Sequence, residues 1–343
     1  MGAQSQSLTG IKVAQRTSFQ PAFEWAAPEA KTMDQYHKVF FIAAPHWRQS
    51  AAYRRALAIA RRSHAALHIG MFLEPRLGMP FLSDHLRDEL LEQCRVDIER
   101  DAQELRSTGM DVTCETLWSA EPCREILDRV ATLKADLVIK NVHHEAALRR
   151  VFVTPLDYRL LRACQVPLHL VAEALNPLPL KVAAALDVAR PELLTSGLNE
   201  GIIQAARNLA SLCGAELHFL HACDLPSAID YDSATLSSSW DSSYAEQVRI
   251  SLYRTFNHLA DRWQVPMEHR HFVLGPATQG IANFMDDQRI DVVVMGMQSR
   301  LGLDRILGST TERLLYRMSG GMLAVGADTT GHPRLPPGSA EPS

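Results

Sequence analysis

Residues 291–312 are those best suited to do chemistry, because they combine an apolar run, a glycine-containing loop and a helix start. The run 291–295 ends at Gly296, and a polar loop leads to Gly308 and then to Ser309, which opens a Ser-x-x-Glu capping box. This order predicts a loop and a helix N-terminus at the carboxyl end of a buried parallel strand, where α/β sheets bind phosphates. Glycines allow close backbone approach and positive φ, and loop amides attract an anion. The candidate binding residues are Gly296, Ser299, Arg300, Gly302, Gly308, Ser309 and Thr310.

Other residue patterns argue against catalysis and against a metal site. The chain has no G-x-S-x-G motif and no phosphate-loop lysine motif. His218 and His221 fall on one expected strand and His269 and His271 on another, where the i, i+2 spacing puts the second pair on one face. No cysteine accompanies them at metal-ligand spacing, and the nearby acids complete no recognised ligand pattern. We therefore expect no catalytic residues, no metal ligands, and histidines that face solvent or lie at a sheet edge.

Composition is that of a globular protein, with 343 residues, of which 46% are hydrophobic. The formal charge of −4 argues against a general nucleic-acid binder, which is usually basic over at least one domain. No apolar run approaches the roughly 18 residues of a membrane span, and the N-terminus lacks the basic and apolar regions of a secretory signal. We expect a cytoplasmic protein that binds neither nucleic acid nor membranes.

The cysteines form no C-x-x-C pair and sit mostly among apolar residues, so we expect reduced, structural thiols. They are Cys94, Cys114, Cys123, Cys164, Cys213 and Cys223.

The chain contains two copies of one unit. Residues 38–44 resemble 181–187, residues 136–140 resemble 291–295, and the Arg-Leu-Leu triplet at 159–161 recurs at 313–315. The same order of all three matches indicates a tandem duplication. The offset between copies grows along the chain, which fits an insertion in the second copy near the Ser-rich residues 233–243.

Each copy alternates strands with helices, which predicts a doubly wound parallel sheet. Expected strands cover 38–44, 66–73, 111–117, 136–140 and 167–171, then 181–187, 215–222, 267–273, 291–295 and 322–326. Expected helices cover 49–64, 84–107, 121–134 and 154–164, then 190–213, 244–263, 277–288 and 309–319. The expected organisation is a flexible extension (1–36), a degenerate domain (37–173), a linker (174–180), a domain with a partial nucleotide loop (181–327) and a disordered tail (328–343).

Several segments carry a resemblance to a known family. They are the strand that ends at Asp187, the Leu198-Asn-Glu-Gly start of an Ala/Leu-rich helix, Gly275-Pro276 before the helix that leads into 291–296, and the Gly308-Ser309 pair. Residues 137–143 and 152–161 of the first copy have the same character. Over about residues 37–327 the chain resembles the universal stress proteins, specifically their tandem-domain UspE type.

The resemblance implies a five-stranded Rossmann-like parallel sheet in each half. It also implies an intramolecular pseudo-dimer that meets at the last strands, around Leu168–Val171 and Leu323–Val325. Many members bind ATP at the carboxyl end of the sheet. There an acid after the first strand contacts the adenine side, and a G-x2-G-x9-G-[ST] loop holds ribose and phosphates. Asp187 matches that acid, Gly296 the first glycine, and Gly308 with Ser309 the last glycine and the hydroxyl.

The two copies depart from this pattern to different degrees. In the second, Ser299 stands at the middle glycine position and eight residues, not nine, separate it from Gly308, although Gly302 restores some freedom. Two interpretations stay open for it: a competent nucleotide site, or a relic turn with a helix cap. In the first, Ala44 replaces the acid and the loop after Lys140 has no glycine, so we expect no ATP there.

The first-copy loop is basic, because it contains Lys140, His143, Arg149 and Arg150. It could take another anion or a partner surface, or it is a solvated charged loop.

Three functions remain as hypotheses. The first is a cytoplasmic, non-catalytic stress protein that binds ATP or another adenine nucleotide and acts through an unknown protein partner. The second is a nucleotide-free scaffold for an apolar ligand or a protein. The third is an ATP-hydrolysing or nucleotidyl-transfer enzyme of the same fold, which the missing catalytic set disfavours. Beyond the pseudo-dimer, a homodimer is possible.

Overall fold

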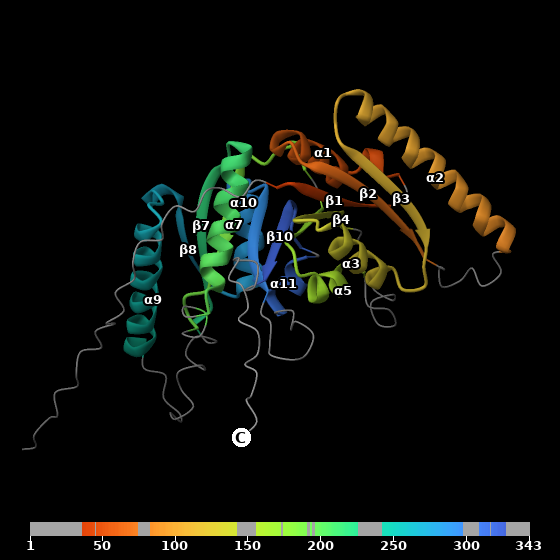
Figure 1. The fold of residues 1–343 in the computed structure, drawn as a ribbon. Helices are drawn as coiled ribbons and strands as arrows, with labels where there is room; N and C mark the ends of the chain where they lie inside the picture. Colours follow the sequence, from red (N-terminus) through yellow and green to blue (C-terminus); the bar gives the residue numbers. More distant parts are fainter. Residues whose placement is uncertain are drawn as a thin grey trace, which may run out of the picture. The chain divides into compact units, whose positions relative to one another are not determined.

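A computed structural model of the chain describes residues 36–44, 46–74, 83–142, 156–172, 174–190, 193, 196–225, 242–297, 309–315 and 317–326. Ten strands of this part form one sheet in the order β3-β2-β1-β4-β5-β10-β9-β6-β7-β8, which Figure 1 shows from β8 on the left to β3 on the right. The strands are β1 (Lys38–Ala43), β2 (Ala66–Leu73), β3 (Val112–Trp118), β4 (Leu137–Asn141), β5 (Leu168–Val171), β6 (Lys181–Ala185), β7 (Glu216–Cys223), β8 (Arg270–Leu274), β9 (Val292–Met297) and β10 (Gly321–Gly326).

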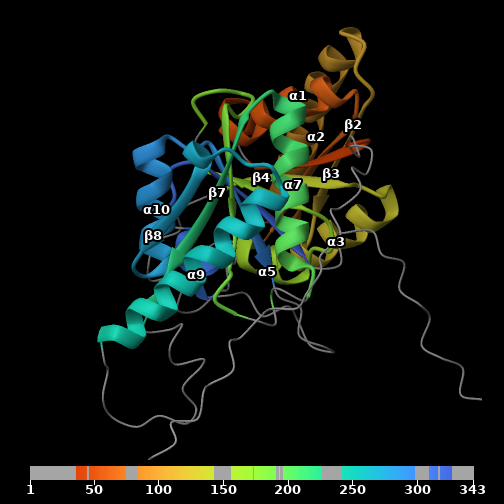
Figure 2. The same cartoon turned by 90° about the vertical axis from the view of Figure 1, so that its left-hand side faces the viewer.

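Helices cover both faces of the sheet. One face packs against α1 (Ala51–Ser63), α2 (Asp84–Ser107), α7 (Leu198–Cys213) and α9 (Ser242–Arg262). The other packs against α3 (Pro122–Leu133), α5 (Leu156–Ala163), α10 (Ala277–Gln288) and α11 (Ser309–Leu314). Two short 3-10 helices are η1 (Trp47–Gln49) and η2 (Met267–His269). Helices α1 and α7 lie side by side (Figure 2), and Arg62 Nε of α1 donates to the carbonyl of Leu212 at 2.9 Å.

The sheet consists of two halves with the same topology. The first half has the order β3-β2-β1-β4-β5, and the second repeats it as β8-β7-β6-β9-β10. All strand pairs within a half are parallel. The central strands are continuous apolar runs because helices cover both of their faces. The structure therefore confirms the expected α/β fold of two tandem, doubly wound five-stranded units.

Strands β5 and β10 join the halves as an antiparallel pair. Their register runs from Gly321 opposite Val171 to Ala324 opposite Leu168. Every residue of both strands is buried. An open edge strand would leave a row of N–H and C=O groups unpaired, and this pairing removes such an edge from each half. The prediction that the last strands of the two copies meet is confirmed.

A buried histidine lies at this seam. The imidazole of His169 is 1% exposed, and its Nδ1 lies 3.1 Å from the carbonyl of Met322. A Cβ on Gly321 would come within 2.8 Å of the His169 ring, so glycine is needed at that position to make room for the imidazole. Burial, reinforced by the charge of Arg55, lowers the pKa of His169 to about 3.

Matching aspartates tie the strands together at their amino ends. The Asp136 carboxylate, just before β4, accepts hydrogen bonds from the amides of His37 and Lys38 at 2.6 and 3.1 Å. Asp291, just before β9, does the same for the amides of residues 180 and 181 at 2.9 and 3.0 Å. The duplication thus preserves a contact between a carboxylate and the backbone as well as the strand order.

Three element bounds differ from the sequence expectation by three or more residues. The helix expected over 190–213 begins only at Leu198, because Gly197 before it adopts a φ of +75° that ends the preceding loop. The expected strand at 267–273 starts as the turn η2 and becomes β8 at Arg270. Helix α11 ends at Leu314, five residues early. Most of the Ser-rich residues 233–243 lie outside the described part. All of the terminal residues 1–35 and 327–343 also lie outside it.

The six cysteines are free thiols and lie buried or half-buried. Burial raises the pKa of both Cys213 and Cys223 to about 11, which keeps these two groups protonated at neutral pH. No helix of the described part is long and apolar enough to cross a membrane.

The buried His169 predicts a pH dependence of stability. The unfolded imidazole titrates near 6.5 and the folded one near 3, so between these values only the unfolded chain binds the proton. The free energy of unfolding should therefore fall as pH drops from about 6.5 toward 3, by up to about 1.4 kcal/mol for each unit separating the two pKa values. Urea unfolding of the unmodified chain and of His169→Gln should show a shallower pH dependence for the variant. His85→Gln, on an exposed helix position, is the control, and equal slopes for all three proteins would contradict the assignment.

Candidate functional site

A pocket of about 510 Å³ opens at the carboxyl end of the second half. Its residues come from the ends of β6, β7 and β9, from the start of α7, and from α10 and α11. Apolar side chains such as Leu198, Ile202 and Met295 form much of the wall, and polar groups interrupt it. The polar lining residues are Asp187, Arg190, Asn199, His221, Asp224, Thr278, Thr310, Thr311 and Arg313. The position fits the rule that open α/β sheets bind ligands outside the carboxyl ends of their strands.

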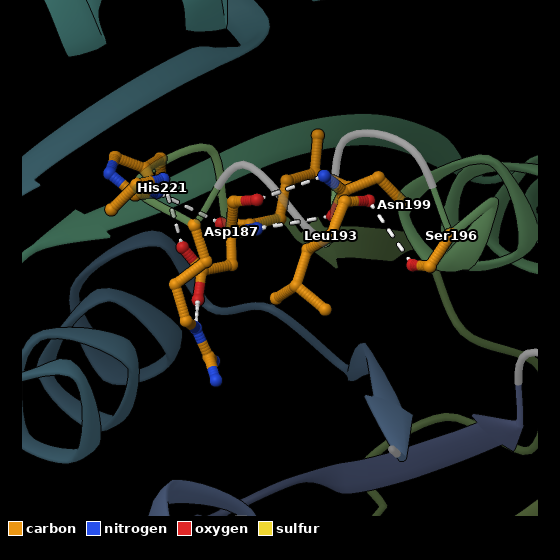
Figure 3. A network of polar contacts seen from close by, with 8 residues as sticks. Asp187, Leu193, Ser196, Asn199 and His221 are labelled. Carbon is orange, nitrogen blue, oxygen red and sulfur yellow. Dashed lines mark hydrogen bonds and ion pairs between the residues drawn. The ribbon is translucent and has the colours of Figure 1, made fainter. Parts of the chain in front are cut away.

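The rim of the pocket is held by a pair of hydrogen bonds between Asp187 and Asn199 (Figure 3). The Asn199 side chain donates from Nδ2 to the carbonyl of Asp187 at 2.9 Å and accepts from the Asp187 amide through Oδ1 at 3.2 Å. Asn199 is 2% exposed and sits in the first turn of α7. These bonds hold the chain after β6 against the start of α7. The residues that follow Asp187 therefore form the rim of the pocket and are not part of α7.

The carboxylate of Asp187 is already engaged. It accepts from Arg190 Nε at 2.6 Å and from the Ala189 amide at 3.0 Å. Both side chains of the ion pair are about one-third exposed, and both line the pocket. Sequence reasoning placed Asp187 at the site but missed its pairing with Arg190, which only the fold of the rim creates. A ligand that uses this carboxylate must share it with Arg190 or displace the guanidinium.

Gly296 lies at the base of the pocket for a packing reason. A Cβ at this position would come within 2.8 Å of Leu198 and 2.9 Å of Ile202, both on α7. Its φ does not lie in the left-handed region. Gly296 is therefore needed for the close approach of α7 to β9, and it does not use the positive φ that a glycine allows.

His221 is a polar group that sequence reasoning did not assign to this site. It is 2% exposed, which corrects the expectation of a solvent-facing or edge position. Nδ1 lies 3.0 Å from the carbonyl of Leu186, and Nε2 has no hydrogen-bond partner among the described residues. Burial lowers the pKa of His221, so the ring is neutral at pH 7, with Nδ1 donating and Nε2 left as an acceptor.

The described part covers only some of the loop residues expected to bind phosphate. Thr310, in the first turn of α11, lines the pocket, and Ser309 begins that helix. Arg313, one turn further, adds a cation that the motif did not point to. Ser299, Arg300, Gly302 and Gly308 lie outside the described residues, so their role stays a prediction.

In the first half, a buried ion pair occupies the equivalent position. Lys140 Nζ lies 2.7 Å from Asp157 Oδ1, and both side chains are less than one-tenth exposed. By strand register and by the repeated Arg-Leu-Leu triplet, these residues correspond to Met295 and Thr311 of the pocket wall. Lys140 of β4 is thus a buried partner of Asp157 on α5, and the expectation that it adds charge to the following loop is wrong.

Ala44 stands where the second half has Asp187, as expected, while His143, Arg149 and Arg150 lie outside the described residues.

Comparison with known proteins finds the same family domain in each half of the chain. The family model described as "Universal stress protein family" matches residues 35–172 and 199–325. "Universal stress protein E" of Photorhabdus laumondii is 23% identical over 305 residues, covering 86% of this chain and 96% of the relative. A Pseudomonas aeruginosa PAO1 protein of unknown function has a crystal structure that superimposes with a TM-score of 0.66 at 23% identity, covering 87% of this chain and 95% of that one. The structure of a universal stress protein from Archaeoglobus fulgidus gives a TM-score of 0.58 at 15% identity, covering 85% and 99%.

The packing role of Gly296 predicts that Gly296→Ala destabilises the chain by about 1–3 kcal/mol, because the added methyl overlaps Leu198 and Ile202. Combining it with Leu198→Ala should cost less than the sum of the two single variants, since the truncation removes the Leu198 atoms that clash, although the contact with Ile202 stays. Urea unfolding of the four proteins measures this coupling. A Gly296→Ala protein of unchanged stability, or strict additivity, would contradict the packing explanation.

The buried ion pair of the first half predicts a difference in stability between single and double variants. Lys140→Met leaves the Asp157 carboxylate buried without its cation and should cost about 3–5 kcal/mol in unfolding free energy. The double variant Lys140→Met/Asp157→Thr, which copies the second half, should recover most of that loss. Thermal or urea unfolding is the measurement, and a double variant less stable than the single one would show that the two positions are not equivalent.

Proposed function

This chain belongs to the universal stress protein family and carries two copies of the family domain, and we propose that it is a non-catalytic binding protein whose second half takes an adenine nucleotide. The observation that carries the proposal is the pocket at the carboxyl end of that half. Its volume of about 510 Å³ falls in the range of small-molecule sites.

The lining fits the parts of a nucleotide. Leu198, Ile202 and Met295 offer apolar surface to a base. Thr310 and Arg313, both from α11, supply a hydroxyl and a cation for phosphate oxygens. The glycine loop expected from the sequence directly precedes α11. The base of a bound nucleotide would therefore lie near the end of β6 and its phosphates near the start of α11.

One site per chain is proposed. In the first half the Lys140–Asp157 pair replaces the wall residues Met295 and Thr311, and Ala44 has no side-chain acceptor. A nucleotide there would have to displace a buried ion pair, which is strongly unfavourable. The degenerate half then serves as the partner that the second half packs against.

Affinity in the second half should be modest. The pair between Asp187 and Arg190 competes with any ribose or base contact to that carboxylate. Ser299 and the shortened loop further restrict how the backbone can surround a triphosphate.

The engaged Asp187 favours a second candidate: a nucleotide-free scaffold whose pocket takes an apolar ligand. With the carboxylate neutralised by Arg190, much of the remaining wall is hydrocarbon. An enzyme of the same fold is the least favoured function, because Asp187 is ion-paired with Arg190 and His221 is buried. We place the protein in the cytoplasm, in the stress response, as the family suggests.

A matched pair of arginine variants tests the nucleotide site. Arg313→Gln should weaken ATP binding about ten- to a hundredfold, because it removes one charge-assisted contact of about 1.5–3 kcal/mol. Its counterpart in the first half, Arg159, is paired with Glu121, so Arg159→Gln should leave binding unchanged. Calorimetry of the full chain with ATP and with adenosine is the measurement, and only ATP affinity should depend on Arg313.

Two further variants separate the alternatives. Gly308→Val should abolish phosphate binding by blocking the loop, and Thr154→Val, at the matching position of the first half, should not. The proposal of one site per chain is wrong if Arg159→Gln weakens ATP binding as much as Arg313→Gln does, or Thr154→Val as much as Gly308→Val. Absence of ATP binding together with a co-purified apolar molecule in native mass spectrometry would favour the scaffold. Release of phosphate or pyrophosphate from ATP and magnesium would instead show an enzyme.

A further inference from the structure

Three histidines and a glutamate meet near the outer edge of the second half, at the amino end of β7. His218 Nδ1 lies 3.1 Å from His271 Nε2, and His218 Nε2 lies 3.4 Å from Glu216 Oε2. The ring of His269 packs on that of His218 with centroids 4.4 Å apart. One ligand atom from each of Glu216, His218 and His269 can be chosen so that all three lie within 4.8 Å of one another.

The position in the sheet separates this cluster from the pocket. Glu216 opens β7, whereas the pocket is lined by residues of β7 near its carboxyl end. His218 is 4% exposed, which again corrects the sequence expectation of an edge or solvent position, while His269 is half-buried and Glu216 exposed. The cluster therefore has a buried imidazole at its base and an open side toward solvent.

The first half shows what the same positions do without a histidine cluster. There His68 contacts Thr113 at 2.8 Å and Glu115 at 3.2 Å, and Arg129 pairs with Glu115 at 3.0 Å. By register and helix position, Thr113, Glu115 and Arg129 correspond to His269, His271 and Phe284. A closed His–Glu–Arg arrangement in one half is thus replaced in the other by three imidazoles backed by an aromatic ring.

The contact between His218 Nδ1 and His271 Nε2 determines which ring nitrogen of His218 is left for a ligand. A neutral imidazole has a free lone pair, which is what a metal ion needs. If Nδ1 of His218 carries its proton and donates to His271, then Nε2 presents its lone pair toward Glu216 and the open side.

We propose that Glu216, His218 and His269 bind a divalent transition-metal ion of the zinc class, with His271 positioning the imidazole of His218 through its other ring nitrogen. Two imidazoles and one carboxylate form a known donor set for zinc that leaves a fourth position for water. Ligands about 2.0–2.1 Å from a tetrahedral ion lie roughly 3.3 Å apart, so His218 and Glu216 already have the required separation. The ligand atom of His269 lies within 4.8 Å of those of Glu216 and His218 and would complete the set.

The bond between His218 and His271 is the kind of outer contact that fixes the ring of a metal-binding histidine. One group opposes the ion: Lys181 Nζ lies 3.7 Å from Glu216 Oε2 and must turn away when the carboxylate binds metal. A groove of about 220 Å³, whose lining includes Arg207, Trp263 and His269, adjoins the cluster at His269.

Metal binding would fasten the edge of the sheet. His218 belongs to β7, whereas His269 lies in η2 immediately before β8, the edge strand of the second half. The residues of β8 are only partly buried or exposed, so this strand depends on β7 for its place. An ion shared by the two segments would link them directly.

The test uses the tag-free full chain, stripped with a chelator and titrated with Zn²⁺ by competition calorimetry and with Co²⁺ by visible absorption. We expect one ion per chain, a cobalt spectrum without thiolate charge-transfer bands, no comparable binding of Mg²⁺, and slower amide exchange in β8 when zinc is bound. Because His218 is buried and its replacement can unfold the protein, the primary variants are Glu216→Gln and His269→Gln, at accessible positions. Each should weaken Zn²⁺ binding at least tenfold.

His271→Gln should weaken binding ten- to a hundredfold, as expected for an outer partner. Lys181→Met should strengthen it, a result that a merely structural role for the cluster would not produce. His68→Gln, the equivalent histidine of the first half, is the matched control and should leave affinity unchanged. The proposal is overturned if Zn²⁺ binds no more tightly than Mg²⁺, if the cobalt spectrum shows thiolate ligands, or if the Glu216 and His269 variants bind as the unmodified chain does.

Discussion

The need to pair the last strand of each half controls the arrangement of the whole molecule. A five-stranded parallel unit that ends in an apolar strand has an edge that must be covered. Antiparallel pairing of β5 with β10 meets this need for both halves at once. Strand direction reverses at that seam, so the strands of the two halves point in opposite directions. The carboxyl ends of the strands in one half therefore lie on the opposite side of the continuous sheet from those in the other half. The pocket of the second half and the equivalent position in the first therefore cannot cooperate by sharing side chains.

The duplication lets one half explain the other, because equivalent positions are identified by register. Where the pocket wall has Met295 and Thr311, the first half has the Lys140–Asp157 pair. Where the second half gathers imidazoles, the first has His68 bonded to Glu115. In both comparisons the first half satisfies its polar groups internally, and the second leaves donors or acceptors available. The backbone contacts of Asp136 and Asp291 are kept in both, as expected for groups that serve the fold.

The sequence was sufficient to predict the fold because its signals are local and repeated. Continuous apolar runs marked the buried strands, and the repeat established which strands of the two copies are equivalent. The pairing at Leu168–Val171 was expected from the family resemblance alone. The start of α7 could not be, since it depends on the φ of Gly197 and on the bonds between Asn199 and Asp187. Site chemistry was predictable only in part: Asp187 and Gly296 were found, but the Asp187–Arg190 pair and the burial of His218 and His221 depend on distances between strands that residue spacing does not encode.

The distance along the chain between the two strands of the seam has a consequence during synthesis. Strand β5 ends at Val171, and its partner β10 begins only at Gly321, about 150 residues later. At translation rates of about 5–20 residues per second, the first half would wait roughly 8–30 seconds with an apolar edge strand unpaired. During that interval nascent chains on neighbouring ribosomes carry the same open edge and can pair with one another. During this interval, chaperones and the spacing of ribosomes on the messenger RNA determine which fraction of the chains pairs β5 with its own β10.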